Sequence, residues 1–188
     1  EAEEELHRRD LLLQGAAKAT NYLLTSDPEA LRKALGILGD AAEVDRVHIL
    51  ENRDLRSEGL RESLPLQWFR ENAGPVYGDL SWEELFPGWQ DTLSRCNPIQ
   101  GITSRLSVPG AKMLEQLGVR SFLILPIFIE GRFFAVIAFE DCHKERRWID
   151  SEIAVLQAAA GSIGEAILRR RTEEALRESQ RTLSTLMS

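Results

Sequence analysis

The sequence predicts an α+β fold, in which a central sheet is covered on both faces and long helices stand at both ends of the chain. Two apolar segments, Leu123–Ile129 and Phe133–Phe139, are rich in β-branched and aromatic residues, as strands are. Between them stands Glu130-Gly131, whose glycine tolerates the positive φ of a hairpin turn. Both segments are apolar at successive positions, so helices or a closed pocket should cover each face. Helical spacing of apolar residues near each terminus completes the prediction.

The N-terminal third is predicted to contain two helices. Charged residues and then apolar residues at helical intervals indicate an amphipathic helix from Glu3 to Leu24. A second helix follows, because Ser26 or Asp27 can cap it and Pro28 fits a first turn, where its missing N–H costs nothing. The buried stripe of this helix is expected to consist of Leu31, Leu35 and Leu38.

Two further strands are predicted before the hairpin, at Arg46–Asn52 and at Leu64–Glu71, with a polar loop between them. From Gly74 to Pro109 the pattern gives way to glycine, proline and aromatic residues. There we expect a short helix that ends near residue 95 and a short strand at residues 99–102. A helix from Gly110 to Leu117 should then stop at Gly118, where a left-handed cap is easy for glycine.

The composition favours one folded domain with helical extensions. The 188 residues are 43% hydrophobic, enough to bury one substantial core. A net charge of -7 disfavours nucleic acid and anionic lipid as partners, and no apolar run approaches the ~20 residues of a membrane helix. The two cysteines, Cys96 and Cys142, fit a reducing compartment, so we expect a cytoplasmic location. Because the chain starts without methionine and ends within a helical pattern, we expect a fragment of a longer protein.

Four motifs together resemble a GAF domain over roughly Pro28 to Arg169. They are Gly118–Ile127, Gly131-Arg132, Phe139–Asp141 and Asp150–Glu152. The resemblance implies a mostly antiparallel sheet with the terminal helices on one face and, on the other, a small-molecule cavity roofed by the irregular insert. It also implies a bacterial-type or archaeal signalling protein such as a sensor histidine kinase of a two-component system. We divide the chain into a signalling helix (1–26), the GAF domain (27–169) and a coiled-coil linker (170–188).

A small-molecule cavity would need aromatic and apolar walls, which the strands and the insert supply. The same side chains also suit an ordinary core. The candidate ligand-binding residues are Trp68, Trp89, Phe122, Ile124 and Phe139.

The resemblance allows several cofactors to be tested. A covalently attached bilin needs a cysteine and a histidine shortly before the central hairpin, where this chain has Pro109 and Gly110. Phe139–Asp141 matches the cyclic-nucleotide pattern too weakly to support that ligand. Haem would need an axial histidine, for which His48 on the first predicted strand is the one candidate. No metal site is predicted, and the ligand stays unknown.

The sequence does not indicate an enzyme. It has no phosphate-binding loop, no phosphoacceptor histidine box and no cyclase signature, so any catalytic output domain should lie elsewhere. Cys142 and His143 are neighbours on one strand, where side chains point to opposite faces, so they do not form a nucleophile pair. A cysteine-dependent methionine sulfoxide reductase, using Cys96 and Cys142, is the less favoured alternative.

Apolar residues spaced by three and four continue from Ile149 to the end of the chain and predict one long helix. Its part beyond Arg170 carries a narrow apolar stripe among charged residues, which indicates a dimeric coiled coil. Residues 173–179 also resemble the signalling helix that joins GAF domains to a following domain. We expect ligand binding to shift the paired terminal helices; a ligand-free dimerisation spacer, or a solvated connector, is the alternative. The candidate dimerisation residues are Leu176, Leu183 and Leu186.

Overall fold

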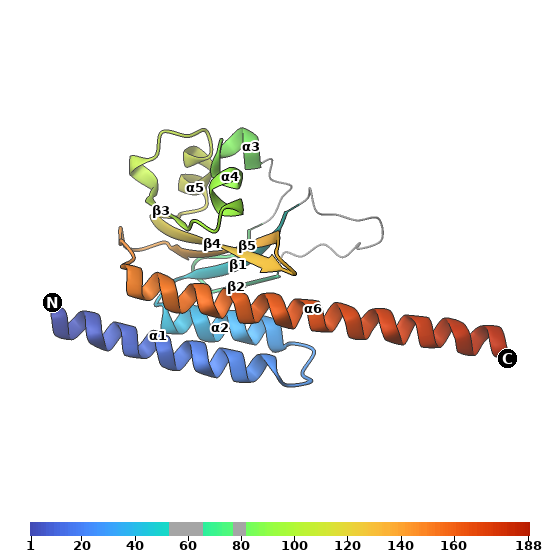
Figure 1. The fold of residues 1–188 in the computed structure, drawn as a ribbon. Helices are drawn as coiled ribbons and strands as arrows, with labels where there is room; N and C mark the ends of the chain where they lie inside the picture. The colour runs from blue at the N-terminus through green and yellow to red at the C-terminus, as the bar shows by residue number, and fades with distance from the viewer. Residues whose placement is uncertain (53–65, 77–81) are drawn as a thin grey trace.

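The computed structural model describes residues 1–52, 66–76 and 82–188, which form an antiparallel sheet between two helical layers (Figure 1). The sheet order is β2-β1-β5-β4-β3, and every neighbouring pair is antiparallel. This arrangement confirms the predicted α+β fold class. The strands are β1 (Arg46–Glu51), β2 (Leu66–Phe69), β3 (Ile99–Ile102), β4 (Ser121–Ile129) and β5 (Arg132–Asp141).

Three long helices cover one face of the sheet. They are α1 (Ala2–Leu23), α2 (Ala30–Ala41) and α6 (Asp150–Met187). Helices α1 and α6 run side by side in the same direction, and α6 continues well beyond the sheet (Figure 1). Helix α2 begins later than the sequence suggested: Pro28 precedes it, Glu29 occupies the cap, and the Asp27 carboxylate accepts a hydrogen bond from the Glu29 backbone N–H at 2.8 Å.

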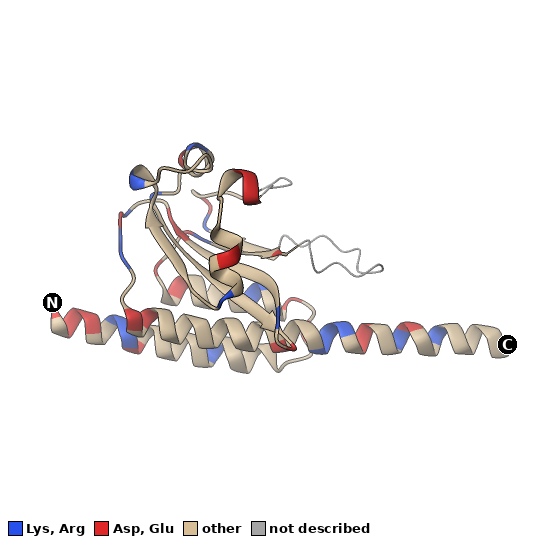
Figure 2. Ribbon diagram, turned by 45° about the horizontal axis from the view of Figure 1, so that its top comes forward, with Lys and Arg blue, Asp and Glu red and all other residues tan. Residues whose placement is uncertain are grey.

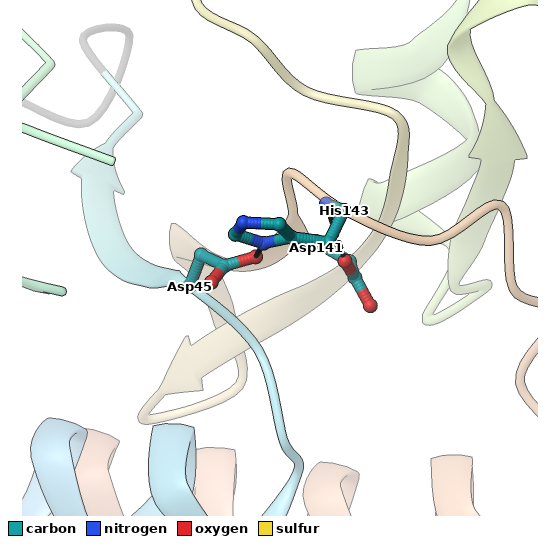
Figure 3. Close-up of side chains that lie close together, drawn as sticks. All are labelled: Asp45, Asp141 and His143. Atoms are coloured by element: carbon teal, nitrogen blue, oxygen red, sulfur yellow. Dashed lines mark hydrogen bonds and ion pairs between the residues drawn. The ribbon is translucent and has the colours of Figure 1, made fainter. Parts of the chain in front are cut away.

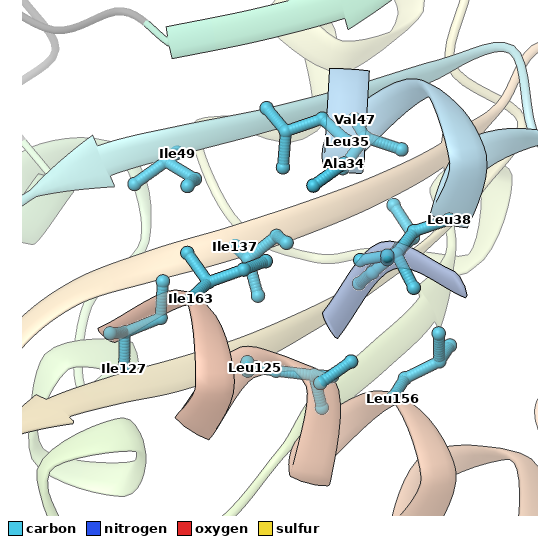
Figure 4. Packing of buried hydrophobic residues seen from close by; sticks show 14 of the residues in the cluster. Ala34, Leu35, Leu38, Val47, Ile49, Leu125, Ile127, Ile137, Leu156 and Ile163 are labelled. Atoms are coloured by element: carbon cyan, nitrogen blue, oxygen red, sulfur yellow. The ribbon is translucent and has the colours of Figure 1, made fainter. Parts of the chain in front are cut away.

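The helix-covered face holds the main hydrophobic core (Figure 4). Alternate strand residues point toward the helices because successive side chains of a strand leave opposite faces. Leucines from α2, which were predicted as its buried stripe, pack against these strand residues. The side chains of this core that have no exposed surface include Ala34, Leu35, Leu38, Val47, Ile49, Leu125, Ile127, Ile137, Leu156 and Ile163.

The opposite face is covered by the irregular insert, which we call the roof (residues 82–117). The roof contains four short helical segments and the edge strand β3, which lies at the predicted residues. The single short helix expected before residue 95 is two helices, because Gly88 breaks it at φ 79°. The helical segments are α3 (Trp82–Leu85), α4 (Trp89–Ser94), η2 (Thr103–Arg105) and α5 (Ala111–Gln116).

The β4–β5 hairpin turns as the sequence predicts. Glu130 and Gly131 both have positive φ, at 51° and 74°, which suits the two-residue turn of a twisted hairpin. Phe122 and Ile124 face the roof, whereas Leu123 and Leu125 face the helices. The uninterrupted apolar pattern of the hairpin therefore reflects a central pair of strands buried on both faces. The loop predicted between the first two strands, and the start of the second at Leu64, lie outside the described residues.

Trp68 of β2 lies directly against α2 and depends on two glycines of that helix. A Cβ atom built on Gly39 would lie 2.1 Å from the Trp68 ring, and one on Gly36 would lie 3.0 Å from it. We predict that Gly39→Ala destabilises the fold by about 1–3 kcal/mol through overpacking, although alanine favours helices. Gly161→Ala, at an exposed helical position with open space around it, should stabilise by about 0.5–1 kcal/mol. Urea unfolding of both variants checks the sign, and equal effects would contradict the close contact.

Candidate functional site

A largely enclosed cavity of about 30 Å³ lies between the roof and the sheet. Its walls are almost entirely apolar and come from both layers. The sheet contributes side chains of β1, β4 and β5, while the roof contributes α3, α4, α5 and the ends of the loops between them. The described lining residues are His48, Leu50, Val76, Trp82, Phe86, Trp89, Met113, Leu114, Leu117, Phe122, Ile124, Ala138 and Glu140.

Aromatic rings form the roof-side wall in a continuous row. The ring centroids of Trp82 and Phe86 are 5.5 Å apart, and those of Phe86 and Trp89 are 4.4 Å apart and stacked. Trp89 in turn lies 5.5 Å from Phe122 on β4, so the row joins the roof to the sheet. Such ring pairs add about 0.5–1.5 kcal/mol each beyond the area that they bury.

Three ionisable side chains form a polar floor beneath this apolar wall. Arg46 and Glu140 pair directly across β1 and β5 and form a salt bridge, with exposures of only 1% and 4%. His48 lies two residues along β1 on the same face, and its Nε2 is 2.9 Å from the Glu140 carboxylate. We call Arg46, His48 and Glu140 the floor triad.

The floor triad keeps the Glu140 carboxyl ionised. Burial by itself would raise the pKa of Glu140, but the hydrogen bond with His48, together with the charge and hydrogen bond of Arg46, lowers it by more, so it lies below its usual 4.5. The remaining Arg46 donors reach backbone carbonyls of Ala73 at 2.7 Å, Gly74 at 3.0 Å and Leu117 at 3.4 Å. Every charge in the triad is therefore matched by a partner inside the protein.

The other ring nitrogen of His48 is the exception. His48 is 4% exposed, and its Nδ1 has no hydrogen-bond partner among the described residues. Buried polar atoms are rarely left unpaired, because each costs about 1–3 kcal/mol. Since His48 lines the cavity, a bound molecule could supply the missing partner.

The predicted ligand-binding residues divide between the two faces of the sheet. Trp89, Phe122 and Ile124 line the cavity. Trp68 and Phe139 lie on the helix-covered face, where Trp68 meets α2 and the Phe139 ring packs 6.2 Å from that of Trp148. The reason is alternation along a strand: Phe139 is next to Glu140, which faces the cavity, so the Phe139 side chain must face away.

Neither cysteine lies at the cavity. Cys96 is exposed after α4, and Cys142 follows β5 half-buried. Burial raises the pKa of the Cys142 thiol to about 11, which disfavours the reactive thiolate. The described lining residues therefore do not fit a thiol-linked bilin or a reductase that uses cysteines in the cavity. Haem would need far more space than this cavity has.

A second cluster, formed by Asp45, Asp141 and His143, joins the start of β1 to the end of β5 (Figure 3). Its ligand atoms lie within 4.8 Å of one another, a set that could hold a cation. The carboxylates are already engaged, however. Asp45 accepts hydrogen bonds from the Cys142 backbone N–H at 2.7 Å and lies 3.0 Å from His143 Nδ1, while Asp141 accepts from the backbone N–H groups of His143 and Lys144 at 2.8 Å. These hydrogen bonds hold the start of β1 against the end of β5.

Three consecutive arginines hold α6 where it leaves the sheet. Arg169 donates to the Leu23 carbonyl at 2.8 Å, and Arg170 donates to the carbonyls of Asp27 and Pro28. Arg171 forms a salt bridge with Glu51 at the end of β1 and lies 4.6 Å from the centre of the Phe134 ring. These contacts tie α6 to the α1–α2 connection and to the sheet at one level.

Beyond these arginines, every residue of α6 is exposed. Positive and negative side chains alternate along it (Figure 2), and the predicted dimerisation residues Leu176, Leu183 and Leu186 are 59%, 56% and 79% exposed. No helix among the described residues is both long and apolar enough to cross a membrane.

The family model of the GAF domain matches residues 28–167 of the chain. The chain belongs to the GAF family. It is 37% identical over 179 residues to the methanogenesis regulatory histidine kinase FilI of Methanothrix harundinacea (strain 6Ac), a match that covers 92% of this chain and 20% of that protein. A shorter match, 38% identical over 53 residues, is to the circadian input-output histidine kinase CikA of Synechocystis sp. and covers 28% of the chain and 6% of that protein. The matched part of the chain thus spans about a fifth of the length of FilI and a smaller share of CikA.

Solved GAF domains share the fold. The GAF domain of a protein assigned as a sensor histidine kinase from Pseudomonas syringae pv. tomato has a TM-score of 0.63 at 17% identity, covering 94% of this chain and 99% of that one. The phycocyanobilin-bound GAF domain of a cyanobacterial phytochrome has a TM-score of 0.62 at 14% identity, covering 88% and 96%. The family assignment confirms the predicted resemblance, and it describes a sensory module rather than a catalytic domain.

Arg46 and Glu140 of the floor triad were not predicted from the sequence, and His48 was considered only as a haem ligand. The signal was present: Arg46 and Glu140 each stand next to a buried apolar strand residue, Val47 and Phe139 respectively. A charged residue at such a position is rarely buried unless it is paired, so one of them predicts the other.

We predict that Glu140→Gln destabilises the GAF domain by about 3–5 kcal/mol at pH 7, because it leaves Arg46 buried without its counter-charge. The pKa of Glu140 is lower in the folded protein than in the unfolded chain, so its contribution is full above pH 4.5 and is lost as the pH falls through the folded value. The difference between wild type and variant should therefore shrink in acid.

Urea unfolding between pH 7 and pH 3 measures this difference. Glu165→Gln, at an exposed position on α6, is the matched control and should stay within about 0.5 kcal/mol of wild type. A difference for Glu140→Gln that is small at pH 7, or that is constant across the range, would contradict the buried pair.

Proposed function

We propose that this GAF domain is the sensory module of a multidomain histidine-kinase-like signalling protein, in which it binds a small molecule and passes the change to an output domain through paired terminal helices. The observation that carries the proposal is the enclosed cavity above a buried polar floor. The similarity to FilI, a histidine kinase, supports the setting. The two free cysteines agree with a cytoplasmic location.

We propose Trp89, Phe122 and Ile124 as ligand contacts, since all three line the cavity. Trp89 is part of the roof and is only partly buried, whereas Phe122 and Ile124 are fixed in the central strand β4. A bound molecule would therefore rest on a rigid sheet and act on a more loosely held roof.

Strand β1 supports a route from the cavity to the output helix. His48 and Leu50 face the cavity, and the next residue, Glu51, faces the other way and binds Arg171 of α6. At the other end of α6, the buried Glu152 lies 3.6 Å from Arg8 of α1, so the two terminal helices are also joined to each other. A displacement of β1 would change the contacts of α6 at the point where it leaves the domain.

Dimerisation is proposed through the exposed leucines of α6 and α1. Leu176 and Leu183 are seven residues apart and so lie on the same side of the helix, flanked by charged residues of both signs, as in a coiled-coil seam. Helix α1 also exposes large apolar side chains, namely Leu6, Leu11 and Leu13.

One observation favours a ligand-free spacer instead. The cavity of about 30 Å³ has room for about one water molecule, and such a volume is compatible with a filled core. A spacer would dimerise in the same way but would respond to no small molecule.

We predict that a thermal-shift screen of small metabolites finds at least one compound that stabilises the wild-type chain but not Ala138→Leu. Ala138 is 3% exposed and lies in the cavity wall, so the larger side chain fills the space. A ligand at 100 times its Kd stabilises by ~2.7 kcal/mol, which raises the Tm of a chain of this size by about 5–10 °C. If every stabilising compound acts equally on both proteins, or none is found, the spacer function stands.

We further predict that Leu176→Asp and Leu183→Asp each shift the chain from dimer to monomer, because a carboxylate in a coiled-coil seam must be desolvated. Thr185→Asp, on the opposite side of the helix, adds the same charge and should leave the dimer intact. Analytical ultracentrifugation at several concentrations gives the association state. Monomeric wild-type chain, or a dimer that all three variants retain, would exclude this seam.

A further inference from the structure

We infer that the cavity takes a small uncharged molecule with an aromatic or otherwise apolar body and one N–H or O–H group, and that His48 Nδ1 accepts the hydrogen bond from that group. The inference rests on the proposed ligand-binding function and specifies its ligand. It starts from the one buried polar side-chain atom that the described lining residues leave without a protein partner.

The contacts of the imidazole decide which proton it carries. Nε2 lies 2.9 Å from a Glu140 oxygen, and an ionised carboxylate only accepts hydrogen bonds, so Nε2 carries a hydrogen. The single negative charge of Glu140 is already balanced by Arg46. A second cation at His48 would leave a net charge in a buried cluster, which is strongly unfavourable. The neutral ring therefore has Nδ1 as an acceptor, which calls for a donor on the ligand.

No cation in the described lining is available for an acidic ligand. The guanidinium of Arg46 is used by Glu140 and by three backbone carbonyls, and both oxygens of Glu140 are used by Arg46 and His48. A phosphate or carboxylate placed here would lose its hydration without gaining a counter-charge. The floor triad thus disfavours anions and selects an uncharged molecule.

The walls specify the rest of the molecule. Aromatic rings on one side and aliphatic side chains on the other suit a flat apolar body. A six-membered ring needs more than the present 30 Å³, so the roof must yield. Trp82, Trp89 and Met113 are only partly buried, and their outward movement would open the cavity while the floor stays in place.

The test compares phenol, toluene and benzoate, which share a ring but offer a donor, no polar group and an anion. Titration calorimetry with the whole 188-residue chain at pH 7 should show phenol binding between about twofold and tenfold more tightly than toluene, with benzoate weaker than phenol. Ala138→Leu, which fills the cavity, should abolish binding of all three. His48→Phe, which keeps a ring but removes the acceptor, should reduce phenol to the affinity of toluene and leave toluene unchanged.

A second measurement does not depend on a variant that folds. In wild-type chain labelled with ¹⁵N-histidine, phenol should shift the Nδ1 resonance of His48 and toluene should not. Equal affinities for phenol and toluene, or an unchanged Nδ1 resonance, would overturn the inference while the cavity would remain a binding site. Tightest binding of benzoate would overturn it in favour of a protonated His48. Failure of all three probes to bind at the cavity would refute the proposed ligand binding as well.

Discussion

The salt bridge between Arg46 and Glu140 lies where the sheet, the roof and the cavity meet. Its partners face each other across β1 and β5, and the guanidinium also reaches the carbonyls of Ala73, in the turn after β2, and of Leu117, at the end of the roof. One side chain thus joins the central strands to the roof and to the segment that follows β2. Since the cost of an unpaired buried charge is several kcal/mol, these parts keep their arrangement only together. The orientation of His48 follows from the same carboxylate.

Strand β1 connects the floor triad to helix α6. Side chains alternate between the two faces along a strand. His48 and Leu50 therefore face the cavity, while their neighbour Glu51 faces the other way and contacts α6. Arg171, which contacts Glu51 and the Phe134 ring, is the last residue of α6 before the part in which every residue is exposed. A ligand changes this contact only if it binds two arrangements of β1 or the roof unequally, which is the requirement for any transmitted signal.

The sequence predicted the hairpin, the terminal helices and the layering because these features rest on periodicity and on local turn chemistry. It predicted the cavity walls less well because an apolar run on a doubly buried strand does not reveal which residues share a face. Trp89, Phe122 and Ile124 line the cavity, whereas Trp68 and Phe139 lie across the sheet. The pairing of Arg46 with Glu140 would have shown which residues of β1 and β5 face the cavity. No local sequence pattern, however, shows a partner 94 residues away. The break of the roof helix at Gly88 depends on how the insert folds over the sheet.

The two faces of the sheet differ in how firmly they are held, and this difference decides where a ligand can act. The helix-covered face is packed by helices of 12 to 38 residues, with side chains that have no exposed surface. The helical segments of the roof have only three to six residues, too few to be stable without their contacts to the sheet. Local opening therefore requires the least free energy on the roof side, and a molecule that completes the aromatic row would order the roof against the sheet. Under the proposed function, binding energy would go into the choice between roof arrangements, and the contacts of Arg46 with Ala73 and Leu117 would pass that choice to β1 and so to the start of the free part of α6.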